Sequence, residues 1–472
     1  MATPTLVQHV SHSNTQGNTV TSYQVRLPNP SLAGNCILVG VNRSAAGVAP
    51  TVTDDKSNTY TSLGSSSDGN QVVHLFAALN CTAGVQNITL TFGTATNFVS
   101  GLASEFNNIA TASAKDTVSA GANPTTGTGS STSIATAAFT PSTSGDLLYQ
   151  FGIQDSTSSP ITSFTQGSSP WKLLSADIFD STFAQFQVQV SAASITPTAT
   201  MSPTNAWNTI AVALKNATAG NAPTGMYIRR CQHNAIPASS GSPVATQFPC
   251  DGNLLVMSTI MEPNLTLTAV ADGNSNTYSN TGTAFSNSTS GNCRHYYVVN
   301  PTTTTTMTGP TLTFTGSPIS GSTLIAFDIA GASTSAPYDS TAGRATASGN
   351  QVAAGSFSGA AITPSRAGGI IISTLGIESN TINAVSGGGH ILLSSADTPE
   401  TSPWPNDQNN GWADVTNAPA SSATPSWTTT GGGAAHWANI ADVFLPPSTA
   451  VINPNLIVGP GPSSFQPNMV SY

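Results

Sequence analysis

The apolar residues of this chain lie in short runs rich in Val, Ile and Leu, separated by Gly, Pro, Asn and Ser. Such runs are typical of strands in antiparallel sheets. No stretch keeps the 3.6-residue period of an amphipathic helix. The sequence therefore predicts an all-β protein with very little helix. The clearest predicted strands are 20–27, 36–41, 72–79, 88–92, 101–106, 147–152, 183–190, 210–214, 254–258, 295–299, 312–314, 323–329, 370–375, 391–394 and 440–445.

The pattern of residues 1–216 occurs a second time. Gly34-Asn35 precedes an apolar run, and Gly252-Asn253 precedes its copy 218 residues later. The stretch Asp-x-x-Ser-Asn-Thr-Tyr follows at 54–60 and recurs at 272–278 with the same separation. Duplication of whole modules is typical of scaffolds and multivalent binders rather than of enzymes.

Two further signatures lie later in each copy. Thr-Pro-Ser occupies 140–142 and 363–365, and Trp-x-x-Ile-Ala occupies 207–211 and 437–441. All six Trp lie in these later parts, which favours an A-B-A-B order over four equal repeats. We therefore predict four tandem antiparallel β-sandwich modules, each long enough for its own core. The predicted modules are 1–110 (A1), 111–216 (B1), 217–333 (A2) and 334–446 (B2), followed by a C-terminal extension at 447–472.

The C-terminal extension contains a strand-like piece flanked by Pro that cannot belong to a fifth module. Its apolar residues are Val451, Ile452, Leu456, Ile457 and Val458. Two interpretations stay open: an assembly arm that lies along the sheet edge of a neighbouring subunit, and a segment that packs on module B2 of its own chain.

Charged side chains make up only 7% of the sequence, with 11 basic against 20 acidic residues. A sparsely basic, acidic chain cannot neutralise many phosphates, so we expect no nucleic-acid partner and no anionic membrane surface. No apolar stretch approaches the length of a membrane span, so no membrane insertion is expected. The N-terminal residues lack the basic and apolar regions of a secretory signal, which favours a protein made in the cytoplasm.

Five cysteines occur, at positions that are not equivalent in the two copies. They are Cys36, Cys81, Cys231, Cys250 and Cys293. A bridge between Cys36 and Cys81, with one more pair among the other three, is one interpretation, and isolated buried thiols are the other. Their spacing does not suggest a zinc site.

One succession of motifs carries a resemblance to a known group of proteins. Gly-Asn before an apolar run, then Asp-x-x-Ser-Asn-Thr-Tyr, an aromatic strand and Thr-Leu-Thr-Phe occur at 34–39, 53–60, 74–78 and 89–92, with a copy within 252–314. This succession resembles the jelly-roll-like β-sandwich modules of phage virion proteins and secreted bacterial surface proteins. Modules B1 and B2 match it only at the strands. The resemblance implies jelly-roll-like sandwiches in an exposed particle or cell-surface protein, not an enzyme.

The acidic loops resemble calcium loops in one respect. Asp272, Asn274 and Asn276 place oxygen-bearing side chains at alternating positions, but the twelfth position is Thr283, which cannot supply the bidentate carboxylate of an EF-hand. The favoured interpretation is an Asx-type turn between two strands, with a weak Ca²⁺ site as the alternative. No other cofactor is expected. His74 and His295 lie on corresponding predicted strands, where core histidines are expected rather than metal ligands.

A long loop near residues 397–414 combines Trp with carboxylates and amides. Trp404, Asp407, Trp412 and Asp414 are its candidate glycan-binding residues, because aromatic faces stack on sugars and planar polar groups bind hydroxyls. The alternative is that Trp404 and Trp412 close the core of module B2.

The sequence offers no motif for catalysis, such as a nucleophile elbow, a zinc-protease helix or a phosphate-binding loop. We therefore expect a non-enzymatic structural protein of a phage virion, a capsid-decorating or tail-appendage subunit that partners with other virion subunits, as a homo-oligomer, after synthesis in the host cytoplasm. The alternatives are a secreted or surface adhesin that binds a cell-surface glycan, and an extracellular filament subunit.

Overall fold

The structure is a computed structural model of the whole chain. It describes residues 2–12, 19–45, 47–155, 161, 163–177, 182–236, 244–245, 247–261, 265–287, 290–302, 311–315, 322–352, 355–378, 381–397, 408–430 and 434–448.

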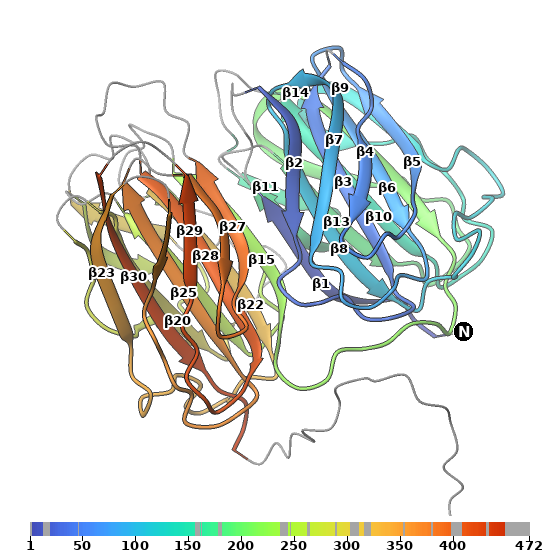
Figure 1. Ribbon diagram of the computed structural model, residues 1–472. Coiled ribbons are helices and arrows are strands. Elements are labelled where there is room, and N and C mark those ends of the chain that lie inside the picture. The colour runs from blue at the N-terminus through green and yellow to red at the C-terminus, as the bar shows by residue number, and fades with distance from the viewer. Residues whose placement is uncertain are drawn as a thin grey trace, which may run out of the picture.

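A ten-stranded sheet runs through the middle of the molecule (Figure 1). Its central strands, β1 and β15, pair in parallel, with His9 opposite Arg230 and Val10 opposite Cys231. All other neighbours in this sheet are antiparallel. In spatial order its strands are β19 (Ser279–Asn280), β20 (Asn292–Val299), β17 (Leu254–Met261), β22 (Ser322–Ala330), β15 (Tyr227–Ile236), β1 (Thr5–His12), β8 (Ser100–Asn107), β3 (Cys36–Ser44), β6 (Gln71–Ala78) and β5 (Tyr60–Ser67).

In the first half of the chain, both faces of this sheet are covered. Val39 packs with Leu90 of a small three-stranded sheet on one face, and Leu38 packs with Tyr149 of a six-stranded sheet on the other. Successive residues of β3 are therefore buried on both faces, which is why its sequence is a nearly continuous apolar run. The small sheet contains β2 (Val20–Arg26), β7 (Asn87–Thr96) and β4 (Thr51–Asp54). The six-stranded sheet contains β11 (Ser163–Gln166), β14 (Thr198–Leu214), β10 (Leu147–Asp155), β13 (Thr182–Val188), β12 (Lys172–Asp177) and β9 (Thr125–Ala135).

The second half has matching layers on the opposite faces. Met257 packs with Leu312 of a small sheet, and Val256 packs with Ile372 of a larger one. The small sheet contains β16 (Val244–Ala245), β21 (Thr311–Thr315) and β18 (Thr266–Ala271). The larger sheet contains β23 (Ala345–Val352), β30 (Ala434–Phe444), β25 (Gly369–Glu378), β28 (Gln408–Ala418) and β27 (Ile391–Asp397). A last sheet contains β24 (Gly355–Ser358), β29 (Ser426–Thr430) and β26 (Thr381–Ser386).

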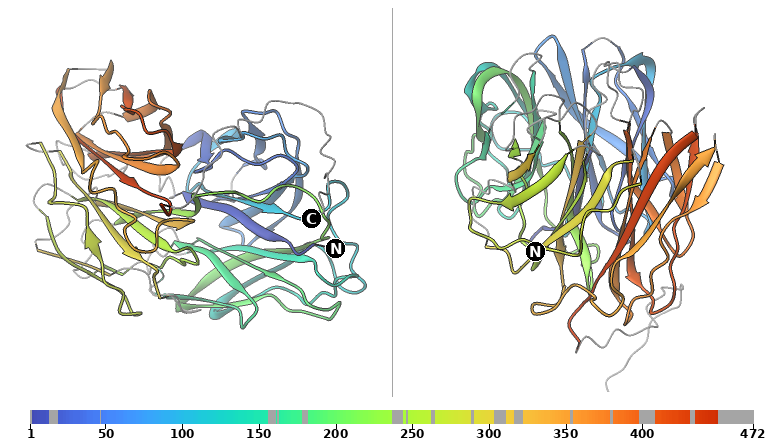
Figure 2. Two further views of the ribbon diagram at one scale, coloured as in Figure 1. Left: turned by 90° about the horizontal axis from the view of Figure 1, so that it is seen from below. Right: turned by 90° about the vertical axis from the view of Figure 1, so that its left-hand side faces the viewer.

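The strand order is the same in the two halves. From the seam outward it runs β1-β8-β3-β6-β5 on one side and β15-β22-β17-β20-β19 on the other. The packed sheets also correspond, as β9-β14-β10-β13-β12 and β23-β30-β25-β28-β27. Parallel central strands, mirrored order and exchanged faces are what a two-fold axis along β1 and β15 produces. Figure 2 shows the two halves side by side along this seam.

The all-β prediction is confirmed: the described residues form strands and contain no helix. All the strands predicted from apolar runs are present. The structure does not contain four separate cores. One apolar cluster includes Val39 of the first half, Val256 of the second and Trp412 of the large B2 sheet. The predicted module boundaries stay a prediction.

Candidate functional site

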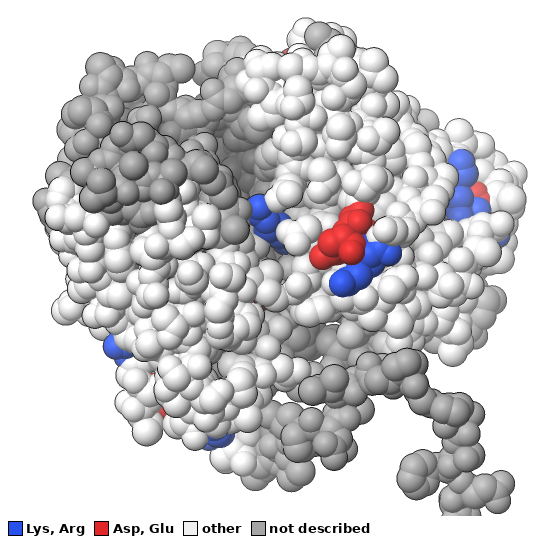
Figure 3. Space-filling model, viewed as in Figure 1, with Lys and Arg blue, Asp and Glu red and all other residues white. Residues whose placement is uncertain are grey.

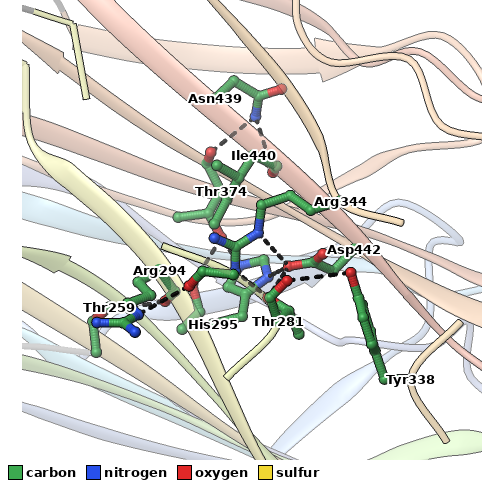
Figure 4. Close-up of polar contacts among 12 residues, drawn as sticks. Thr259, Thr281, Arg294, His295, Tyr338, Arg344, Thr374, Asn439, Ile440 and Asp442 are labelled. Carbon is green, nitrogen blue, oxygen red and sulfur yellow. Dashed lines mark hydrogen bonds and ion pairs between the residues drawn. The ribbon is translucent and has the colours of Figure 1, made fainter. Parts of the chain in front are cut away.

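A chain of hydrogen bonds crosses the interface between the ten-stranded sheet and the sheet of β25 and β30 (Figure 4). His295 on β20 places Nδ1 2.7 Å from Asp442 Oδ2 on β30, and Nε2 2.7 Å from Thr374 Oγ1 on β25. Thr374 Oγ1 lies 2.7 Å from Ser258 Oγ on β17. The indole Nε1 of Trp412, on β28, donates to Ser258 Oγ over 2.9 Å. The chain therefore joins two strands of one sheet to three of the other.

The direction of the hydrogen bonds follows from the chemistry of the two ends. The Trp412 indole can only donate, and the ionised Asp442 carboxylate can only accept. With a neutral imidazole, Ser258 donates to Thr374, Thr374 donates to His295 Nε2, and His295 Nδ1 donates to Asp442. One arrangement of protons therefore supplies a donor and an acceptor for every bond of the chain.

The negative charge of Asp442 is balanced inside the interface. Arg344 Nε lies 3.2 Å from Asp442 Oδ2, and the Thr281 hydroxyl donates to the same oxygen over 2.6 Å. Arg344 also donates to Thr281 through Nη2. Burial opposes ionisation of Asp442, but the hydrogen bonds from His295 and Thr281 and the positive charge of Arg344 outweigh it and lower the pKa. Burial lowers the pKa of His295, so its imidazole is neutral at neutral pH.

A hydroxyl, an imidazole and a carboxylate at these distances resemble the arrangement of a nucleophilic triad. The side chains of Thr374, His295 and Asp442 are all completely buried. The Thr374 hydroxyl is also hydrogen-bonded to Ser258, so this hydroxyl is enclosed by buried side chains and does not face a substrate. The arrangement therefore holds two sheets together rather than presenting a nucleophile.

The first half has its own buried network at a different place. His9 on β1 bonds Ser104 Oγ through Nδ1 over 2.8 Å and Ser175 Oγ through Nε2 over 2.9 Å. Ser104 in turn lies 3.0 Å from the Tyr149 hydroxyl. Burial, aided by the nearby Arg230, lowers the pKa of His9 to about 3. This network consists of neutral groups alone.

One buried carboxylate occurs at the same register position in both halves. Gln8 donates to Glu105 over 2.6 Å in the first half, and Arg230 lies 2.6 Å from Asp328 in the second. In each case the acid also accepts a backbone N–H from the loop before the next strand, Leu32 or Gly252. Burial raises the pKa of Glu105 despite its neutral donors. The two halves thus keep a buried acid at this position, but its donor is neutral in the first half and positively charged in the second.

Both acidic loops close on themselves as Asx turns. Asp272 Oδ1 accepts the backbone N–H groups of Asn274 and Asn276, and Oδ2 accepts the Asn276 amide and the Tyr278 hydroxyl. Asp54 accepts the corresponding four bonds in the first half. These bonds agree with the favoured turn interpretation. Within the described ranges, no group of three or more His, Cys, Asp or Glu side chains is placed to hold a metal ion. The Ca²⁺ alternative stays untested.

The candidate glycan residues have a different position from the one predicted. Trp412 and Asp414 are completely buried, on the face of β28 that packs against the ten-stranded sheet. The prediction of a surface contact is therefore wrong for these two, because the polar residues before β28 obscured the alternation of a core strand. Burial raises the pKa of Asp414 well above its usual value. Trp404 and Asp407 lie outside the described residues.

His74 and His295 lie on corresponding strands but face opposite ways. His74 pairs with Val41, which packs toward the small sheet, whereas His295 pairs with Ser258 at the large interface. A shared role is therefore excluded, while the expectation of core histidines is confirmed. All five cysteines are buried and free, so the bridge between Cys36 and Cys81 is not formed.

Sequence reasoning missed one pair of buried acids. Asp116 accepts the backbone N–H of Ser142, and Asp339 accepts that of Ser365 over 2.7 Å. Ser142 and Ser365 end the repeated Thr-Pro-Ser signature. The repeat of Asp in front of each signature was the signal that could have found these contacts.

No protein-family model, curated protein or solved structure matches this chain. Among the described residues, no helix is long and apolar enough to cross a membrane. The predicted assembly residues Val451, Ile452, Leu456, Ile457 and Val458 lie outside the described residues.

Proposed function

We propose that this chain is a non-enzymatic structural protein of a phage virion, a capsid-decorating or tail-appendage subunit that acts by self-assembly or by docking on a particle. The observation that carries the non-enzymatic part is the burial of Thr374, His295 and Asp442. The groups that most resemble catalytic machinery are used to hold sheets together.

The two halves are joined as a scaffold protein requires. Gln247 of the second half bonds both the backbone N–H and the carbonyl of Phe164 in the first, over 2.7 and 2.9 Å. Gln232 donates to the carbonyl of Ala176 over 3.1 Å. Because these bonds are buried and paired, they favour one fixed arrangement of the halves.

The outer face of the small sheet in the first half carries hydroxyl groups in a row. On β2, β7 and β4, Ser22 lies opposite Thr91 and Thr91 opposite Thr51, and all three are exposed. Figure 3 shows how few charged side chains reach one face of the molecule. Contacts made by such a surface depend little on ionic strength, which suits an assembly that must persist in varied salt.

Electron microscopy of the purified chain and of its source particle tests this proposal. We compare the full-length protein with a version that ends at Leu445, and expect regular arrays or particle docking only for the full-length chain. The matched control keeps the length but changes Val451, Ile452, Leu456, Ile457 and Val458 to Ser.

The control is expected to behave like the truncated chain. Monomers that neither associate nor dock, with or without the extension, would contradict the assembly role. Open polymers formed by the chain unaided would instead support a filament subunit.

A further inference from the structure

Two groups of ion pairs lie in the second half, each with a fully buried aspartate. Arg230 pairs with Asp251 and Asp328, and Asp442 pairs with Arg344 while it accepts a hydrogen bond from the neutral His295. At the position of the first of these contacts, the first half uses the neutral Gln8 beside Glu105. The second half is therefore held together by ionised groups where the first half uses neutral ones.

The pKa values of the carboxyl groups also differ between the two halves. In the second half, hydrogen bonds and positive charge outweigh burial and lower the pKa of four of them, at Asp251, Asp272, Asp339 and Asp442. In the first half Asp116 shows the same lowering. Burial instead raises the pKa of Glu105, and raises that of Asp146 to about 6. Asp414 is the second-half exception with a raised pKa.

We propose that acid releases the second half of the molecule before the first, beginning at the interface between β20 and β30. The structural reason is the chain of bonds through His295. A protonated imidazole donates from both nitrogens, so Thr374 can no longer donate to Nε2 and must turn toward Ser258. Ser258 already receives the Trp412 indole, so its own proton loses its acceptor.

The charged and polar groups around His295 already make hydrogen bonds or ion pairs of their own. Asp442 faces it from β30 and is shared with Arg344, which comes from the segment before β23. Tyr338 comes from the same segment and donates to the carbonyl of Thr281. Cys293, two residues earlier on β20, donates to the carbonyl of Ala438. A second positive charge beside Arg344 is therefore balanced by one carboxylate alone.

The sign of the pH dependence is the same for both partners. His295 has a lowered pKa in the fold, so the unfolded chain takes up this proton first, and stability falls as the pH drops below about 6.5. The lowered pKa of Asp442 contributes stability above its unfolded value of 3.8, and this is lost as the pH falls through the folded pKa. Buried histidines with a lowered pKa number three in each half, so the difference between the halves lies in the buried Arg230–Asp328 and Arg344–Asp442 ion pairs of the second half. These histidines are His9, His12 and His74, and His233, His295 and His390.

Hydrogen exchange of the full chain, read by mass spectrometry between pH 7 and pH 3 and corrected for intrinsic exchange, tests the proposal. We expect β20, β25 and β30 to lose protection about one pH unit above the point at which β3, β6 and β10 lose it. Loss of protection in both halves together, or in the first half first, would overturn the proposal.

Two variants locate the trigger. His295→Gln cannot titrate, so the steepness of opening of the second half is expected to fall by about one proton, or tenfold per pH unit. His9→Gln, the control in the first half, should leave the opening of the second half unchanged. An unaltered steepness in a folded His295→Gln protein would remove His295 from the trigger, and the order of opening in the unmodified chain stands as a test even if that variant fails to fold.

Discussion

The two halves of the molecule use the same strands to bury different side chains. Gly40 pairs with Leu75 at the register position where Ser258 pairs with His295, and Phe151 pairs with Ala184 where Thr374 pairs with Trp412. The members of the second-half network, Ser258, His295, Thr374, Trp412 and Asp442, therefore correspond to Gly40, Leu75, Phe151, Ala184 and Val212. What is polar in one half is apolar in the other.

The exchange conserves space as well as topology. In the first half the ring of Phe151 occupies the room that Gly40 leaves, since a Cβ on Gly40 would lie 3.1 Å from that ring. In the second half Thr374 is small, Ser258 has a side chain, and the large indole of Trp412 comes from the next strand. Tight interiors tolerate such swaps when the total volume is kept.

The reverse exchange occurs at the first-half network. His9 and Ser104 are paired on β1 and β8, while Cys231 and Phe327 are paired on β15 and β22. Both second-half residues belong to the apolar core. The comparison teaches that this topology requires a filled interface but not a polar one, so each network belongs to its own half.

Removing the charge at the centre of the second-half network should have the largest effect. Asp442→Asn leaves Arg344 buried without its ionised partner, and we expect a loss of about 3–5 kcal/mol in the free energy of unfolding. Asp251→Asn is the control, because that aspartate is 46% exposed in its ion pair with Arg230 and should cost less than about 1 kcal/mol. Urea denaturation of both variants measures the difference, and equal losses would contradict an ionic second half.

A side chain at Gly40 tests the exchange of volume. Gly40→Ser brings its Cβ within 2.9 Å of Leu102 and 3.1 Å of Phe151, so a loss of about 1–3 kcal/mol is expected. Adding Phe151→Thr, which copies the second half, should make the pair cost less than the sum of the single changes, by at least about 0.5 kcal/mol. Gly93→Ser, whose Cβ approaches only Val48 at 3.9 Å, is the control. Additive effects in the double variant would break the proposed correspondence.

The smallest effect is expected when the indole donor of Trp412, at the end of the chain of hydrogen bonds, is removed. Trp412→Phe keeps an aromatic ring but leaves Ser258 without its indole donor, and the unpaired group should cost about 1–2 kcal/mol beyond the lost ring volume. Trp427→Phe is the matched control, since Trp427 is equally buried and its Nε1 bonds no atom among the described residues. Thermal unfolding of the two variants gives the difference, and equal melting temperatures would show that the indole proton adds nothing.

Apolar strands could be predicted from the sequence because their pattern is local. The side chains at 36–41 point alternately toward two covered faces, so the run is apolar throughout. The seam strands were missed for the opposite reason. Gln8, His9 and Arg230 are polar and yet buried, because their partners are supplied by strands far away in the chain, as with His9 and Ser104 at a separation of 95 residues.

The buried network could not be predicted for the same reason of distance. His295 is 79 residues from Thr374 and 147 residues from Asp442, so no local spacing joins them. The acidic loops are the contrast, since Asp54 and Asp272 bond residues within six positions and were correctly interpreted as turns. Chemistry that depends on contacts within one loop was predictable, and chemistry that depends on sheet packing was not.

The parallel seam has a consequence for the order of synthesis. A nascent chain that has completed its first half can pair β1 with β8 but has not yet made β15. Until then the outer edge of β1 presents unpaired backbone groups, and such an edge pairs readily with another chain. Tyr227, the first residue of β15, follows Leu214 closely, so the ribosome supplies the missing strand within about a few seconds. The short connection thus protects each growing chain from its neighbours on the same messenger.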